Sequence, residues 1–241
     1  MTIWAIVPAA GIGSRMAGSA SGPVPKQYRM LLGKAVLSHS LGKLLAVPQV
    51  AHVVVALNRD DVYWQSLPEA NAERISTVVG GSERVHSVMN ALLSLERAED
   101  DDWVLVHDAV RPCVAVDDIA ALIAGLSSHA VGGLLASPVD NTIKKIDAED
   151  QVVCTVDRES LCNALTPQLF RYAVLREALQ HAVADGVQVT DEASALEKYG
   201  HRVAVIMGSK FNIKITHEED LAVAEFLLRK QQEQAGVGES S

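Results

Sequence analysis

The sequence predicts an α/β protein, with a mostly parallel β-sheet covered by helices on both faces and a projecting β-hairpin arm. Short apolar runs that suit buried strands alternate along the chain with segments of helical periodicity. The first run, residues 3–7, is unbroken and suits a strand buried on both faces. A length of 241 residues fits one large domain, 1–241, without an internal repeat or linker.

The expected elements follow this alternation in order. Unbroken apolar runs predict strands, whereas apolar residues at intervals of three and four predict helices. We expect further strands at residues 51–57, 75–79, 103–106, 131–137 and 201–207. We expect helices at residues 35–47, 63–67, 84–97, 117–129, 166–184, 189–199 and 218–231.

Local signals predict where some of these elements begin and end. Thr166 followed by Pro167 predicts a helix start, with threonine as N-cap and proline at the first helical position. Gly200 is expected to end the preceding helix in a left-handed conformation. The polar residues 232–241 are expected to be frayed.

The segment 139–158 differs from the rest and predicts the arm. Residues 142–146 and 152–156 are strand-like and flank the acidic turn 147–150. Because an isolated two-stranded hairpin is marginally stable in water, we expect this one to dock on another surface.

Composition excludes several classes of protein. No apolar run approaches the length of a membrane span and no secretory signal is evident, so we expect a cytoplasmic protein without a membrane partner. The formal charge of −9 argues against general nucleic-acid binding. Three cysteines without C-x-x-C spacing indicate reduced thiols rather than a disulfide framework or a zinc site.

The turn after the first strand is the main candidate for a ligand site. Residues 8–16 read P-A-A-G-I-G-S-R-M, so small side chains leave backbone N–H groups uncovered, and Gly11 and Gly13 allow positive φ. Such a turn can wrap an anion, and Arg15 and Lys26 add positive charge. We interpret this stretch as a triphosphate cradle. This stretch does not match the dinucleotide-binding fingerprint, because Met16 stands where the third glycine would be. It does not match a P-loop either, because the G-K-[ST] that would close the loop is absent. A plain surface loop remains the alternative.

Two more segments follow strands in the same way. The Gly80–Gly81 turn opens a helix, so its backbone donors can meet a polar ligand, or it is a plain connection. Asp108 and Arg111 follow the strand at 103–106, where open α/β sheets bind ligands. Asp108 could ligate Mg²⁺ or accept a ribose hydroxyl, and the alternative is an Asp–Arg pair that stabilises the strand end.

Residues 8–16 together with P-K-Q-Y at 25–28 resemble the signature of the 2-C-methyl-D-erythritol 4-phosphate cytidylyltransferase family. Further matches extend to about Leu228: G-G-x-x-R-x-x-S from 80, H-D-A-x-R-P from 107, T-I-K from 142, D-R-x-x-L from 157, L-T-P-Q from 165 and N-I-K-I-T from 212. Four departures are visible, namely a longer segment at 17–24, Val110 in place of alanine, Asn141 where aspartate is usual, and a divergent segment at 208–211.

The resemblance implies a Rossmann-like nucleotidyltransferase fold and a reaction of CTP with 2-C-methyl-D-erythritol 4-phosphate. The products would be the cytidine diphosphate derivative and pyrophosphate, in nonmevalonate isoprenoid synthesis, with Mg²⁺ or another divalent cation. It also implies a homodimer in which the arm at about 139–158 exchanges between subunits. Two alternatives stay open: a cytidylyltransferase for another polyol phosphate, such as ribitol 5-phosphate, and a non-catalytic nucleotide-binding protein.

The resemblance also implies roles for individual residues. Arg15 and Lys26 would be catalytic, stabilising the α-phosphoryl transition state, and Asp108 would be a candidate metal ligand beside the CTP phosphates. The candidates for CTP binding are Pro8, Ala9, Ala10, Gly11, Gly13, Ser14, Gly80, Gly81, Ser82, Ser87, Asp108 and Ala109. The candidates for binding the acceptor substrate are Arg111, Thr142, Arg158, Thr166, Thr190 and Lys214. Arg84 is expected either to join the nucleotide site or to hold its turn together.

Overall fold

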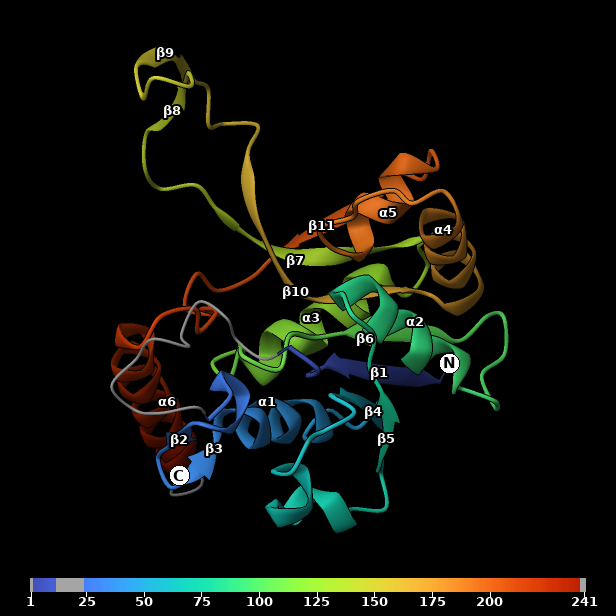
Figure 1. Ribbon diagram of the computed structural model, residues 1–241. Helices are drawn as coiled ribbons and strands as arrows, with labels where there is room; N and C mark the ends of the chain where they lie inside the picture. Colours follow the sequence, from blue (N-terminus) through green and yellow to red (C-terminus); the bar gives the residue numbers. More distant parts are fainter. Residues whose placement is uncertain (1, 12–23, 239–241) are drawn as a thin grey trace.

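A seven-stranded sheet forms the centre of the computed structural model, which describes residues 2–11 and 24–238 (Figure 1). Its strand order is β11-β7-β10-β6-β1-β4-β5. The bounds are β1 Ile3–Pro8, β4 Val50–Leu57, β5 Ile75–Val79, β6 Trp103–Val106, β7 Gly132–Pro138, β10 Cys162–Arg171 and β11 Ala204–Met207. All pairings in the sheet are parallel except the two that β10 makes with β6 and β7. The expected mostly parallel sheet is therefore confirmed.

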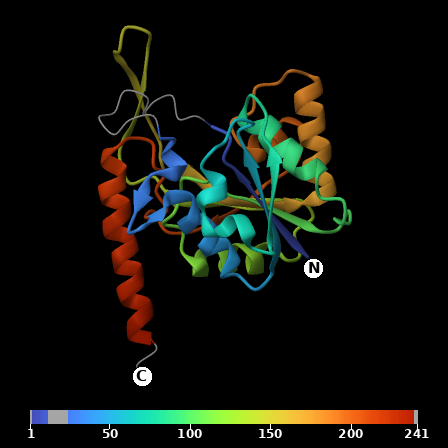
Figure 2. The same ribbon diagram turned by 60° about the horizontal axis from the view of Figure 1, so that its bottom comes forward.

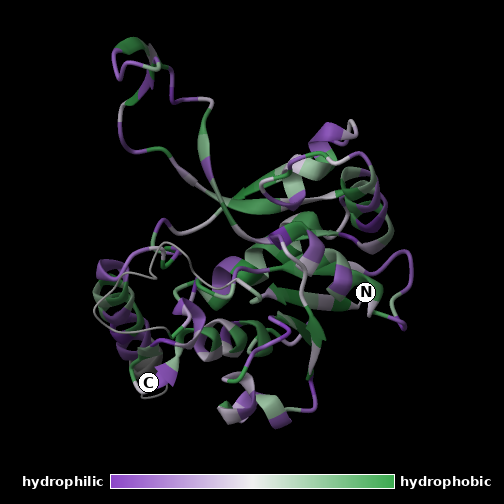
Figure 3. Cartoon of the chain, in the orientation of Figure 1, coloured by the Kyte–Doolittle hydropathy of each residue, from purple (hydrophilic) through white to green (hydrophobic). Residues whose placement is uncertain are grey.

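Helices cover both faces of this sheet, as expected. The bounds are α1 Val36–Leu45, α2 Arg84–Leu93, α3 Val116–Leu126, α4 Tyr172–Ala184, α5 Glu192–Lys198 and α6 Glu219–Gly238, with short 3₁₀ helices η2 Lys26–Tyr28, η3 Trp64–Ser66 and η4 Pro68–Asn71. Successive residues of β1 point to opposite faces, so that Ala5 packs with α1 and α3 whereas Ile6 packs with α2, α4 and α5. Figure 3 shows the central strands as strongly hydrophobic, in keeping with burial on both sides.

The last helix lies beside this layered body. Figure 2 shows α6 along one side of the molecule, near the small hairpin of β2 Met30–Leu31 and β3 Lys34–Ala35. Ala224 and Leu228 of α6 pack with Leu31 and Ile215 in a third apolar cluster. No helix in the described ranges is both long and apolar enough to cross a membrane.

The helix start predicted at Thr166 and Pro167 is wrong. Both residues lie in β10, and α4 begins only at Tyr172. The cause is tertiary pairing, because β10 fills the space between β6 and β7 and bonds to both, which outweighs a local capping signal. Proline is tolerated here because the register with β7 shifts between Ala164 and Gln168.

Several other predicted ends also differ from the structure. The helix expected to reach 97 ends at Leu93, and the strand expected from 201 begins at Ala204. Residues 232–238, expected to be frayed, continue α6. The left-handed stop at Gly200 is confirmed, with φ of 82° after α5.

The arm is a two-stranded antiparallel hairpin, as predicted. Strands β8 Ile143–Ile146 and β9 Val152–Val156 pair with each other and project away from the sheet (Figure 1). Three apolar side chains near its tip, Ile146, Val152 and Val153, are 52%, 61% and 57% exposed. Within the described residues of this chain, nothing covers most of the surface of these three side chains.

Candidate functional site

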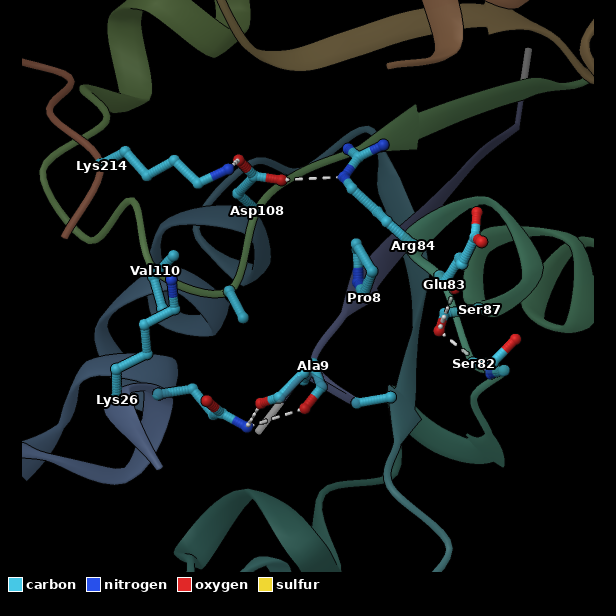
Figure 4. A pocket seen from close by; sticks show the side chains of 15 residues that line it. Pro8, Ala9, Lys26, Ser82, Glu83, Arg84, Ser87, Asp108, Val110 and Lys214 are labelled. Carbon is cyan, nitrogen blue, oxygen red and sulfur yellow. Dashed lines mark hydrogen bonds and ion pairs between the residues drawn. The ribbon is translucent and has the colours of Figure 1, made fainter. Parts of the chain in front are cut away.

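A cleft of about 300 Å³ opens at the carboxyl ends of β1, β5 and β6, where ligands of open α/β sheets bind (Figure 4). The first cleft, as we call it, is lined by Pro8, Ala9, Ala10, Gly11, Lys26, Gln27, Gly81, Ser82, Glu83, Arg84, Ser87, Asp108, Ala109, Val110 and Lys214. The structure thus brings together nearly all the described residues predicted to bind CTP. Gly80 lies behind the lining, and Gly13, Ser14 and Arg15 lie outside the described residues.

The turn after β1 is held in place by Gln27. The buried Gln27 amide donates from Nε2 to the carbonyl oxygens of Ala9 at 2.8 Å and Gly11 at 3.1 Å. Lys26, its neighbour, lies at the edge of the same cleft. These bonds fix the predicted triphosphate turn and the predicted catalytic lysine relative to each other.

The turn at 80–84 is held by the first residues of α2. The Gly81 amide donates to Ser87 Oγ at 3.1 Å, and that hydroxyl donates to the Glu83 carbonyl at 3.2 Å. A Cβ atom at Gly80 would lie 2.5 Å from Ala10 Cβ, so glycine allows this turn to approach the turn after β1 closely. At Gly81 a Cβ atom would meet His86 Cβ at 2.2 Å.

We therefore expect Gly80→Ala to weaken CTP binding by about tenfold or more, because the added methyl group separates the two turns that form the first cleft. Calorimetric titration with CTP measures the change. Gly42→Ala is the matched control, since its Cβ would meet nothing within 4 Å in α1. Equal CTP affinities of the Gly80 and Gly42 variants would contradict this account.

Asp108 is the centre of a cluster of charges. Its carboxylate oxygens lie 3.2 Å from Arg84 Nε, 2.8 Å from Lys214 Nζ and 3.5 Å from Arg111 Nε. Figure 4 shows Arg84 and Lys214 reaching Asp108 from opposite sides. Burial by itself would raise the pKa of Asp108, but the three cations hold that pKa well below its usual range. Asp108 therefore stays ionised.

This crowding bears on the predicted metal site. Both Asp108 oxygens already face cations, and no group of three or more His, Cys, Asp or Glu side chains in the described ranges could hold a metal ion. Mg²⁺ sites in phosphoryl-transfer proteins use one or two carboxylates together with substrate phosphates. The surroundings of Asp108 do not fit a direct metal ligand.

A second cleft of about 260 Å³ lies on the other side of this cluster. Its lining comprises Arg84, Asp108, Arg111, Ala164, Leu165, Thr166, Gln168, Thr190, Asp191 and Lys214. Arg111, Thr166, Thr190 and Lys214, all predicted to bind the acceptor, therefore meet in one place. Thr142 and Arg158 do not join them, because both lie exposed at the arm, where Arg158 Nη1 donates to the Asp140 carbonyl.

His107, behind the cluster, is fully buried and supports both Thr166 and Arg111. Its Nε2 lies 3.1 Å from the Arg111 carbonyl, which can only accept, so Nε2 carries the proton. Nδ1 then accepts from the Thr166 hydroxyl at 3.1 Å, while Thr166 Oγ1 accepts from the Asp108 amide at 3.0 Å. Burial lowers the pKa of His107 to about 4, so the imidazole is neutral at physiological pH.

This burial predicts a pH dependence of stability. Below about pH 6.5 an unfolded chain protonates this histidine, whereas the folded chain does so only near pH 4. As the pH is lowered from about 6.5 to about 4, the free energy of unfolding should therefore decrease by about 3 kcal/mol on account of this residue. Urea unfolding of wild type and of His107→Asn between about pH 4 and 6.5 isolates the contribution of His107. Burial also lowers the pKa of His39 and of His52, but both residues are present in both proteins, so their contributions cancel. Parallel pH profiles of the two proteins would contradict the assignment.

Some residues in or beside the two clefts had no predicted role in the site. Gln27, Gln168, Glu192 and Asn212 are polar yet buried, and each holds a neighbouring part of the site. The Asn212 side chain donates from Nδ2 to the Thr166 backbone carbonyl at 2.7 Å. The Asn212 backbone carbonyl accepts from Arg111 Nη1 at 2.7 Å. Gln27, Gln168 and Asn212 lie inside motifs that match the family, and this position was the only sequence feature that could have indicated a role in the site. Nothing in the sequence indicates which groups they contact.

Comparisons with known proteins agree on one family. A family model described as IspD, 2-C-methyl-D-erythritol 4-phosphate cytidylyltransferase, matches residues 3–230. Relatives with that enzyme name include one from Pseudoalteromonas translucida, 52% identical over 96% of this chain and 92% of its own, and one from Vibrio vulnificus, 50% identical over 95% of both. The crystal structure of the Francisella tularensis enzyme superposes with a TM-score of 0.81 at 37% identity, covering 94% of this chain and all of that one.

Proposed function

The chain belongs to the 2-C-methyl-D-erythritol 4-phosphate cytidylyltransferase family, and we propose that its two clefts bind the two substrates of that reaction. The enzyme transfers the cytidylyl group of CTP to 2-C-methyl-D-erythritol 4-phosphate, giving 4-diphosphocytidyl-2-C-methyl-D-erythritol and pyrophosphate, for isoprenoid precursor synthesis. The observation that carries the assignment is that two neighbouring clefts share Arg84, Asp108 and Lys214.

The first cleft suits CTP. Its floor is the small-residue turn after β1, where backbone groups can approach phosphates, with Lys26 at its edge. The turn containing Gly81 and Ser82 lies opposite, where main-chain donors and acceptors can read the cytosine edge. Arg15 is proposed to add its charge to the phosphate side.

The second cleft suits the acceptor. Arg111 and Lys214 provide positive charge for its phosphate, and Thr166 and Thr190 provide hydroxyl groups for its polyol. Since Arg84, Asp108 and Lys214 border both clefts, the acceptor phosphate would lie next to the α-phosphorus of CTP.

The proposed chemistry is a direct displacement. An acceptor phosphate oxygen attacks the α-phosphorus, a new P–O bond forms, and the bond to the β-phosphate oxygen breaks as pyrophosphate leaves. Attacker and target are both anions, so alignment and charge neutralisation by Lys26 and Arg15 supply the catalysis. No covalent intermediate is required.

The implied divalent cation is proposed to bind mainly to the CTP phosphates. Asp108 is already surrounded by Arg84, Lys214 and Arg111, so its carboxylate would neutralise these cations rather than hold the metal directly.

The active unit is proposed to be a homodimer. Arg158 and Thr142 lie outside the clefts of their own chain, and the arm that carries them exposes apolar side chains. Exchange of the arm with a second copy would bury that surface and could bring both residues to the partner's second cleft.

Pyrophosphate release tests the proposal. The reaction is run with CTP, ATP, UTP or GTP and with 2-C-methyl-D-erythritol 4-phosphate or ribitol 5-phosphate as acceptor. Rapid release only with CTP and the methylerythritol acceptor supports the assignment. A preference for ribitol 5-phosphate would identify a different polyol cytidylyltransferase, and CTP binding without release in any combination would indicate a non-catalytic nucleotide-binding protein.

A further inference from the structure

Arg84, which borders both clefts, forms an ion pair with the buried Glu192 on the side away from Lys214. Glu192, 1% exposed, accepts from Arg84 through both carboxylate oxygens, with Nη1–Oε1 at 2.5 Å and Nη2–Oε2 at 3.0 Å. Arg84 is the first residue of α2 and Glu192 the first of α5. This fork-to-fork contact fixes orientation as well as distance.

Arg84 is the member of the pair that lines the clefts. It borders both clefts, and its Nε donates to Asp108 at 3.2 Å (Figure 4). All three nitrogens of its guanidinium group are therefore directed to carboxylates, which sets the plane of the group at the boundary between the clefts.

Glu192 is held as firmly on its own side. Asp191 caps α5 through the Ser194 amide at 3.0 Å, and Gln168 of β10 bonds to Asp191 Oδ2 at 2.7 Å and to the Ala193 amide at 2.9 Å. Thr190, in the second cleft, directly precedes this clamped turn. The ion pair thus connects the start of α2, which lines the first cleft, to the segment that carries Thr190.

We propose that Glu192 is a positioning residue for cytidylyl transfer, which aligns Arg84 and, through it, the acceptor side of the site with bound CTP. This inference rests on the substrate assignment of the two clefts. Loss of the Glu192 charge would leave Arg84 paired with Asp108 alone, in direct competition with Lys214 and Arg111. The acceptor would then be held in a poorer geometry, while the turns that surround CTP stay intact.

The test compares Glu192→Gln with wild type in kinetics and binding. We expect kcat/KM for the acceptor to fall by about ten- to a hundredfold, since two charge-assisted hydrogen bonds are weakened. The calorimetric Kd for CTP should change by less than about twofold, because among the described residues the hydrogen bonds between Glu192 and the first cleft involve Arg84 alone. Arg84 keeps Asp108 as a counter-charge, so the variant does not leave the Arg84 cation without a partner.

A matched control separates positioning from general stability. Asp102→Asn alters another buried carboxylate, which accepts from Trp4 Nε1 at 3.0 Å near the amino end of β6, away from both clefts. We expect it to lower the melting temperature without changing acceptor kinetics. In a double-mutant cycle, adding Arg84→Gln to Glu192→Gln should lower kcat/KM for the acceptor only slightly further, as expected for residues that act as a unit.

If Glu192→Gln fails to fold, Arg84→Lys serves in its place, since lysine keeps the charge but cannot form the two-pronged contact. Wild-type acceptor kinetics in a folded Glu192→Gln or Arg84→Lys protein would overturn the inference, and so would an equal loss of CTP affinity. Failure of the wild-type enzyme to release pyrophosphate from CTP would instead overturn the proposed function, so the two failures are distinguishable.

Discussion

Lys26→Ala is expected to lower kcat by about 10²–10³-fold while the affinity for CTP changes little. Lys26 lies at the edge of the first cleft, next to Gln27, whose two hydrogen bonds hold the turn after β1. A preorganised charge acts mainly where negative charge develops in the transition state, so its loss appears in kcat more than in binding. Steady-state pyrophosphate release gives kcat, and calorimetry gives the CTP affinity.

Lys34→Ala is the matched control, because Lys34 is an exposed lysine of the nearby β2–β3 hairpin that lines neither cleft. Its kcat should equal that of wild type. Arg15→Ala should behave like Lys26→Ala. A Lys26→Ala enzyme with wild-type kcat would remove this residue from the catalytic role.

Mixing two inactive variants is expected to restore about a quarter of full activity, on random pairing into two-fold dimers. The variants are Lys26→Ala and Arg158→Ala, combined under conditions that allow subunits to exchange. Arg158 lies on the arm, outside both clefts of its own chain, so we expect it to act in the partner's site. Half of the dimers would then be mixed, and one of the two sites in each would contain both intact residues.

Mass spectrometry of the mixture shows whether mixed dimers have formed. Lys26→Ala mixed with Arg111→Ala is the matched control, because both residues line clefts of the same chain and every site in a mixed dimer lacks one of them. Proven mixed dimers without recovery in the Arg158 mixture would contradict a shared site.

Local patterns in the sequence predict most of the sheet and several ends of elements. Residues 3–7 and 51–57 have no competing helical period, and they form the parallel pair β1 and β4. Gly200 follows the end of α5 as expected, because the chain leaves the helix through a residue with positive φ and glycine adopts that conformation freely. Thr166 and Pro167 were misplaced, because strand pairing with β6 and β7 is a long-range contact that a local capping pattern does not report.

The ends of the predicted strands and the family motifs were enough to predict many of the residues that form the site, but not how their side chains pair. Asp108 and Arg111 follow one strand, and their proximity could be inferred from spacing alone. The contacts of Asp108 with Lys214, and of Arg84 with Glu192, join residues far apart in the chain. Which carboxylate reaches which cation depends on how α2, α5 and the segment after β11 pack, and no residue pattern encodes that choice.

The most direct measurement of the central claim is a crystal structure of the chain with CTP and the acceptor. The account predicts CTP in the first cleft, with cytosine at the turn of Gly81 and Ser82 and the triphosphate beside Lys26, and the acceptor phosphate between Lys214 and Arg111. CTP bound in the second cleft, or an acceptor that does not contact Arg111, Thr166 or Lys214, would contradict the division of the site into donor and acceptor halves.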